Sequence, residues 1–106
     1  MELLAAAEGF EWDAGNLEKN WGKHRASRLE CEEAFFNRPL VVEADRLHLH
    51  SLVENRYYAL GQTSLARHLF IVFTVRDKKI RVISARDMNR RERQVFHEKI
   101  KTDPGL

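Results

Sequence analysis

The feature that most constrains the fold is the run of residues 67–75, which is apolar on both faces of an extended strand. One face carries Leu69, Ile71, Phe73 and Val75, and the other carries Phe70, Val72 and Thr74. Such a strand must be covered on both sides, so it lies centrally in its sheet. Asp77-Lys78 follows as the tip of a hairpin, from which residues 80–85 return antiparallel.

Capping signals and alternation predict the other elements. Ser27 with Glu30, and Asn89 with Glu92, are pairs that open helices. The predicted order is a strand at 9–13, helices at 13–24 and 27–37, strands at 40–44, 56–63, 67–75 and 80–85, and a helix at 89–101. This β-α-α-β-β-β-β-α order favours an α+β domain with an antiparallel meander and helices packed on it. We expect one domain over residues 1–106, with 1–8 and 102–106 flexible.

Charge is unevenly distributed along the chain. Residues 1–54 hold 6 Lys/Arg and 11 Asp/Glu, a net −5, whereas residues 55–106 hold 12 and 5, a net +7, in agreement with the overall +2. This bias predicts a basic face for an anionic partner, with nucleic acid first among the candidates. A solvated surface of alternating salt bridges is the competing interpretation.

Cysteine and histidine usage excludes several chemistries. Cys31 is the only cysteine, so the chain forms no internal disulfide and no cysteine-rich metal site, and its acidic neighbours favour a buried, unreactive thiol. His48 and His50 lack a third ligand at a convincing spacing, so no metal site is predicted. Residues 1–8 carry acids without a basic start, and no segment is apolar enough for a membrane span. We therefore expect a cytoplasmic protein.

A further set of residues, within a stretch from about Phe10 to Glu98, is defined by its order and spacing. In chain order it comprises Phe10-Glu11-Trp12-Asp13, Asn20, Lys23-His24, Ser27, Glu33-Ala34, Phe36, Asp45, His50, Glu54, Arg56-Tyr57, Leu60-Gly61, Phe73-Thr74, residues 81–86 and residues 90–93. Together these positions resemble the BrnT family of toxins from type II toxin–antitoxin systems. The resemblance implies a RelE-like fold, a ribonuclease that inhibits translation, a BrnA-type antitoxin as partner, and no cofactor.

Two positions depart from the pattern of these families. Arg25 follows Lys23-His24, where BrnT sequences usually have glycine. Phe96 stands nearest to the place where RelE-like toxins often carry a tyrosine in the last helix. Because a phenol is one candidate proton carrier, its absence leaves the identity of the general acid and base open.

RNA cleavage without metal requires positive charge close to the negatively charged phosphorane, and arginine supplies it through a fork of donors that stays charged. A hairpin that pairs Arg76 with Lys79 also pairs Leu69 with Arg86 and brings Arg67 to the same end of the sheet. We therefore predict that Arg86 and Arg67 converge on one phosphate as catalytic residues. In the alternative interpretation, each arginine pairs with a surface acid.

The proton carriers and the RNA contacts are predicted from position and from the resemblance. His24 and Lys23 are the other predicted catalytic residues, with His24 as a candidate base and a helix-capping role as the alternative for His24. The predicted RNA-binding residues are Arg90, Arg91, Arg93, Arg56 and Glu54. Arg56 and Glu54 lie toward the opposite end of the sheet from Arg86, so an ion pair that supports the fold is the other role open to them.

Two other functions remain open at this stage. One is a module of the same fold that binds nucleic acid without cleaving it, and the other is a protein that only binds an antitoxin. We expect an RNA substrate, free or on the ribosome, and contact with DNA only through the antitoxin. A pure docking module needs charge but not two converging arginines.

Overall fold

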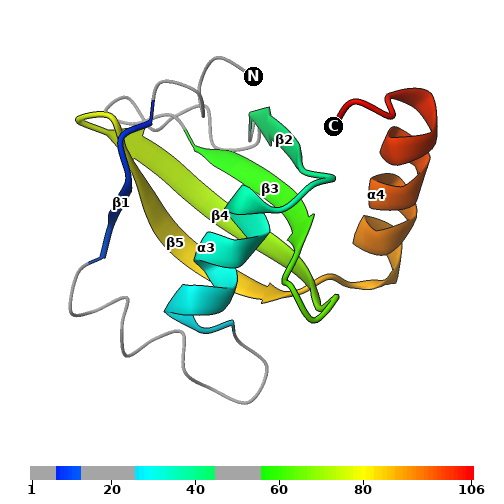
Figure 1. Ribbon diagram of the computed structural model, residues 1–106, viewed down its shortest axis with the longest axis horizontal. Coiled ribbons are helices and arrows are strands. Elements are labelled where there is room, and N and C mark those ends of the chain that lie inside the picture. Colours follow the sequence, from blue (N-terminus) through cyan, green and yellow to red (C-terminus); the bar gives the residue numbers. More distant parts are fainter. Residues whose placement is uncertain (1–6, 13–25, 45–55) are drawn as a thin grey trace.

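The β4–β5 hairpin is the centre of the fold in the computed structural model, which describes residues 7–12, 26–44 and 56–106. The described elements are β1 (Phe10–Glu11), α3 (Arg28–Phe36), β2 (Val41–Ala44), β3 (Tyr57–Gln62), β4 (His68–Arg76), β5 (Lys79–Asp87) and α4 (Arg90–Thr102). The strands form one sheet in the order β1-β5-β4-β3-β2, so β4 is central, as its two apolar faces predict (Figure 1). The predicted helix at 13–24 and the loop at 45–55 lie outside the described residues.

The hairpin turn follows directly from its two residues. Asp77 and Lys78 have φ values of 51° and 63°, a left-handed pair typical of the two-residue turns whose twist matches that of the strands. Arg76 pairs with Lys79 and Phe73 with Val82. The antiparallel hairpin and this part of its register are therefore confirmed.

Beyond that point a β-bulge changes the register. Val72 pairs with Ser84, so Ile83 is an extra residue on β5, and from there Phe70 pairs with Arg86 and Leu69 with Asp87. The predicted pairing of Leu69 with Arg86 is wrong by one residue. Because side chains alternate along a strand, a shift of one residue moves every later side chain to the other face. The bulge therefore decides which face Arg86 occupies.

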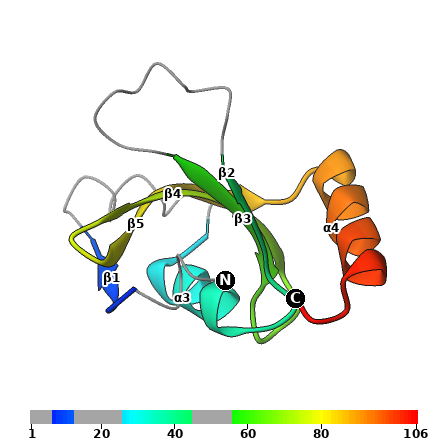
Figure 2. The ribbon, with the colours of Figure 1, turned by 90° about the horizontal axis from the view of Figure 1, so that it is seen from above.

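The edge strand β1 departs from a simple meander. Strands β2 to β5 pair with one another in antiparallel fashion, but β1 is parallel to β5, with Phe10 and Glu11 opposite Ile80 and Arg81. Figure 2 shows α3 and α4 on opposite sides of the curved sheet. Among the described elements the order is β-α-β-β-β-β-α, a mixed α+β arrangement.

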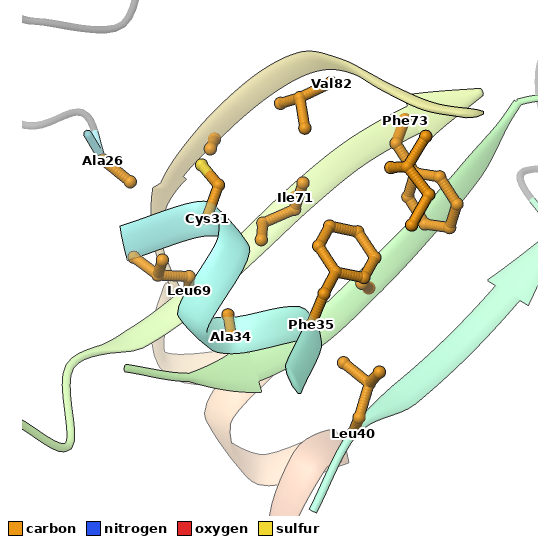
Figure 3. Close-up of a cluster of buried hydrophobic side chains, with 12 residues drawn as sticks. Ala26, Cys31, Ala34, Phe35, Leu40, Leu69, Ile71, Phe73 and Val82 are labelled. Atoms are coloured by element: carbon orange, nitrogen blue, oxygen red, sulfur yellow. The ribbon is translucent and has the colours of Figure 1, made fainter. Parts of the chain in front are cut away.

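The main core lies between α3 and the sheet. Ser27 and Glu30 form the predicted capping box, with the Glu30 backbone N–H donating to Ser27 Oγ at 3.1 Å and the Ser27 N–H donating to Glu30 Oε1 at 2.9 Å. The inner face of α3 is Cys31, Ala34 and Phe35, all buried (Figure 3), and the predicted burial of Cys31 is confirmed. These side chains pack on Leu69, Ile71, Phe73, Val82 and Ala85. The α3 side of the hairpin is thus filled by apolar side chains.

A smaller core lies under α4 on the opposite face. Asn89 and Glu92 form the predicted capping box, and Phe96 is 1% exposed. The cluster consists of Val41, Leu60, Met88 and Phe96, with Tyr58, Phe70, Val95, Ile100 and Leu106 packed against it. Phe96 is therefore a core residue that fixes α4 against the sheet.

Candidate functional site

Arg86 lies near the end of β5, on the face of the sheet that α4 covers. Its Cζ atom is 4.4 Å from the centre of the Phe70 ring, directly across the strand pair. The side chain is 45% exposed. A guanidinium over an aromatic face is stabilised by the quadrupole of the ring. The sheet therefore holds this cation in a defined place while leaving it in contact with solvent.

Glu92 fixes the other side of the Arg86 guanidinium. Arg86 Nη1 donates to Glu92 Oε1 at 2.8 Å, and Nη2 donates to Oε2 at 3.0 Å. Glu92 Oε1 also accepts from the backbone N–H of Asn89 at 2.8 Å. The hydrogen bond to Glu92, opposed by burial, raises the pKa of Arg86. One carboxylate thus caps α4 and orients the arginine with the two-point geometry that a phosphate also offers.

Arg67 lies at the same end of the hairpin but on the α3 face. Its Nη1 donates to both carboxylate oxygens of Glu30, at 2.9 and 3.0 Å, and its Nε donates to Asp87 Oδ1 at 2.6 Å. The hydrogen bond to Asp87 raises the pKa of Arg67, burial opposes that shift, and Glu30 adds to it. Arg67 therefore ties the start of α3 to the end of β5.

The structure does not bring Arg67 and Arg86 together on one phosphate, so the predicted convergence is wrong. The bulge at Ile83 is the physical reason, because it turns Arg86 onto the face of Phe70 and places Asp87 on the face of Arg67. Both arginines pair with acids, as the alternative interpretation held. Only Arg86 stands beside the basic start of α4.

The three arginines at the start of α4 are exposed, and helical geometry separates them. At 3.6 residues per turn, Arg90, Arg93 and His97 fall on one flank of the helix, whereas Arg91 falls on the opposite flank. The positive charge of Arg93 reaches His68 on β4. Arg93 therefore extends the basic surface toward His68, and Arg91 lies on the opposite flank of the helix from Arg93.

The other predicted residues do not join this cluster. Arg56 precedes β3, whose first residue Tyr57 pairs with Phe73, so Arg56 lies toward the opposite end of the sheet from Arg86, as predicted. His24, Lys23 and Glu54 lie outside the described residues. The structure therefore does not test whether these three take part in the site.

A polar network that the sequence did not reveal secures α4 at its other end. The Tyr58 hydroxyl donates to Glu43 Oε2 at 2.5 Å, and Lys99 of α4 forms an ion pair with Oε1 of the same carboxylate. The network joins β2, β3 and α4. Its residues are far apart in the chain, so no local spacing could have indicated it.

Cys31 has the properties of a core residue. Its side chain is buried, and burial together with Glu30 and Glu32 raises its pKa to about 12. A thiol in this state is a poor nucleophile and a poor metal ligand.

Among the described residues no group of three His, Cys, Asp or Glu side chains is placed to hold a metal ion. No helix in the same part of the chain has the length and apolar character needed to cross a membrane.

Basic side chains clustered on one face are the electrostatic footprint of a protein that binds an anionic partner such as nucleic acid. The chain belongs to the BrnT family, because the model of that family, described as "Ribonuclease toxin, BrnT, of type II toxin-antitoxin system", matches residues 12–92. No curated protein matches the chain. The resemblance inferred from the sequence is thus confirmed. Membership implies a ribonuclease toxin with RNA as substrate and a protein antitoxin as partner.

Proposed function

We propose that this chain is a metal-independent endoribonuclease toxin whose RNA lies on the α4 face of the β4–β5 hairpin. The observation that carries the proposal is the placement of Arg86, held between the Phe70 ring and the Glu92 carboxylate at the basic start of α4. In this proposal Arg86 binds the scissile phosphate. Arg90 and Arg93 bind neighbouring phosphates, and Arg67 stabilises the fold from the other face.

In this proposal Arg86 stabilises negative charge in the transition state. When a 2′-hydroxyl attacks the adjacent phosphate, negative charge builds on the non-bridging oxygens of the phosphorane. A fixed guanidinium that is already oriented stabilises this charge without reorganising during the reaction. Glu92 supplies that orientation before RNA arrives. Among the described residues, Arg86 donates from Nη1 and Nη2 to Glu92 and from Nη1 to the Asp87 carbonyl oxygen. A guanidinium has five N–H donors, so Arg86 can also donate to a phosphate oxygen.

The finer assignments belong to the same proposal. We place the fold in the RelE-like group, on the support of the antiparallel meander flanked by helices on both faces. We further propose that the protein works in the cytoplasm, inhibits translation by cutting RNA, and is neutralised by a BrnA-type antitoxin. The support for this partner and this mode of action is family membership.

One observation favours a second candidate function, a module that binds RNA without cutting it. The residue nearest to the tyrosine position of RelE-like toxins is Phe96, which has no phenol to transfer a proton and is buried in the core under α4. Purified protein incubated with a defined messenger RNA separates the two. The enzyme shortens the RNA, and with free RNA it continues to do so in excess EDTA, whereas the binding module retards the RNA in a gel and leaves it intact.

The same assay needs an arm with ribosomes, in which a chelator of transition metals replaces EDTA so that Mg²⁺ still supports the ribosome. Cleavage in either arm that persists with its chelator supports the proposal. Complete loss of cleavage on chelation contradicts metal independence. Intact RNA in both arms contradicts the ribonuclease itself.

A further inference from the structure

Two histidines that are distant in the sequence meet beside the Arg86 site. His68 is the first residue of β4, and His97 lies in the second turn of α4. Their ring centres are 5.8 Å apart, and each ring also contacts Phe96, with centre distances of 5.6 Å. Neither His68 nor His97 is among the site residues predicted from the sequence. The buried Phe96 ring thus contacts one imidazole from the sheet and one from α4.

The His68 ring shares its face of the sheet with the Arg86 contact. His68 and Phe70 are two residues apart on β4, so their side chains leave the same face about 7 Å apart. Arg86 sits over the Phe70 ring, and Phe70 belongs to the same apolar cluster as Phe96. The His68 imidazole and the Arg86 guanidinium therefore lie on the same face of the sheet, each next to Phe70.

The charges around His68 favour its neutral form. Burial, then the positive charge of Arg93, then His97 lower the pKa of His68. Arg86 stands beyond Phe70 on β5, and the cross-strand partner of His68 on β3 is Gln62, which carries no charge. A neutral imidazole at neutral pH accepts a proton. His97 is exposed on α4.

We propose that His68 and His97 are the proton-transfer pair for RNA cleavage at the Arg86 face, an inference that rests on the proposed function. The neutral His68 takes the proton of the 2′-hydroxyl as the 2′-oxygen forms its bond to phosphorus. The bond between phosphorus and the 5′-oxygen breaks, and the protonated His97 gives its proton to that oxygen. The products are a 2′,3′-cyclic phosphate and a 5′-hydroxyl, and solvent restores both imidazoles.

In this division of labour two imidazoles carry out the proton transfers in place of the missing phenol. General acid–base catalysis by a well-placed imidazole contributes about 10²- to 10⁴-fold in rate. Two imidazoles with opposite tasks give a bell-shaped dependence of rate on pH. A pair that only packs on Phe96 would leave that profile unchanged when either ring is replaced.

The test uses purified full-length protein and a messenger RNA carrying a mapped cleavage site, with ribosomes if cleavage requires them. Rates are compared for wild type, His68→Asn, His97→Asn and the control Lys101→Asn, which removes an exposed α4 side chain one turn beyond His97. Both histidine variants should lose about 100-fold or more in rate. His68→Asn should also lose the acidic limb of the profile, and His97→Asn the alkaline limb. The control should match wild type.

A second substrate separates the two roles. RNA with sulfur in place of the bridging 5′-oxygen at the cleavage site has a leaving group that needs no proton. His97→Asn should cut this RNA about as fast as wild type, whereas His68→Asn should remain slow. Because His97 is exposed, its replacement leaves the fold intact, which thermal melting verifies for each variant.

The outcomes distinguish this inference from the function on which it rests. Unchanged rates and pH profiles in both histidine variants, with cleavage still dependent on Arg86, overturn the histidine pair alone. Equal slowing of His97→Asn on both substrates overturns its role as the acid. If wild-type protein cuts no RNA with or without ribosomes, the proposed function and the histidine pair are both overturned.

Discussion

Replacing Arg86 with alanine separates a catalytic arginine from a structural one. The substitution removes the stacking on Phe70 and the ion pair with Glu92, both made by a side chain that is 45% exposed. An exposed cation–π contact stabilises by about 0.5–1 kcal/mol and an exposed ion pair by about 0.2–1 kcal/mol. Glu92 keeps its hydrogen bond to Asn89. The free energy of unfolding should therefore fall by about 1–2 kcal/mol.

That loss of stability is too small to explain a loss of toxicity. For a domain of this size each kcal/mol lowers the melting temperature by about 4–8 °C. A protein with about 5–15 kcal/mol of stability stays almost wholly folded after losing 1–2 kcal/mol. Removing a charged donor from a transition state, in contrast, costs about 100- to 1000-fold in rate. Arg86→Ala should therefore be non-toxic while melting only modestly below wild type.

The assay induces each variant in bacteria, follows growth and protein level, and measures thermal melting of the purified proteins. Arg67→Ala is the matched control, because it removes the same charge at the same end of the hairpin. The substitution removes the ion pairs of Arg67 with Glu30 and Asp87 and should cost more stability than Arg86→Ala. The folded protein should remain toxic. Full toxicity of Arg86→Ala, or its outright unfolding, would refute the role given to this residue.

Further predictions concern charge and burial. Burial raises the pKa of Glu30, but hydrogen bonds from the helix cap and from Arg67 outweigh it and lower that pKa in the folded protein. The stabilisation from Glu30 is therefore present above the pKa of the unfolded chain and is lost as the pH falls through the lower pKa of the folded protein. The difference in melting temperature between wild type and Glu30→Gln should shrink in acid. Cys31, with its pKa raised to about 12, should resist alkylation in native protein and react once the protein is unfolded in denaturant. Arg93→Gln should weaken RNA retention on filters more than Arg91→Gln, and equal weakening would refute the assignment of the two flanks. Association with the protein antitoxin should slow as salt rises, and an on-rate independent of salt would contradict a basic binding face.

Local signals predicted most of the described fold. The two capping boxes, the Asp77-Lys78 turn and the doubly apolar strand each depend on residues that are close in the chain, so their structures follow from local backbone chemistry. The parallel pairing of Phe10 with Ile80 was not predictable in this way, because it joins segments 70 residues apart. The pattern of apolar and polar residues in an edge strand does not show which distant strand it pairs with.

The site was only partly predictable for a similar reason. Arg86 and the basic start of α4 stand out in the sequence, but the bulge at Ile83 does not, since an apolar side chain there fits either register. That one residue separates Arg86 from Arg67. The meeting of His68 with His97 depends on how α4 packs on the sheet, which no spacing along the chain records.

The most direct test of the account maps RNA ends at single-nucleotide resolution in bacteria shortly after induction of the wild-type protein and of Arg86→Ala. The wild type should create new 5′-hydroxyl ends within messenger RNA before growth stops, and Arg86→Ala, at equal protein level, should create none. Growth arrest by the wild type with messenger RNA still intact, or the same new ends in both strains, would contradict the claim that this face cuts RNA through Arg86.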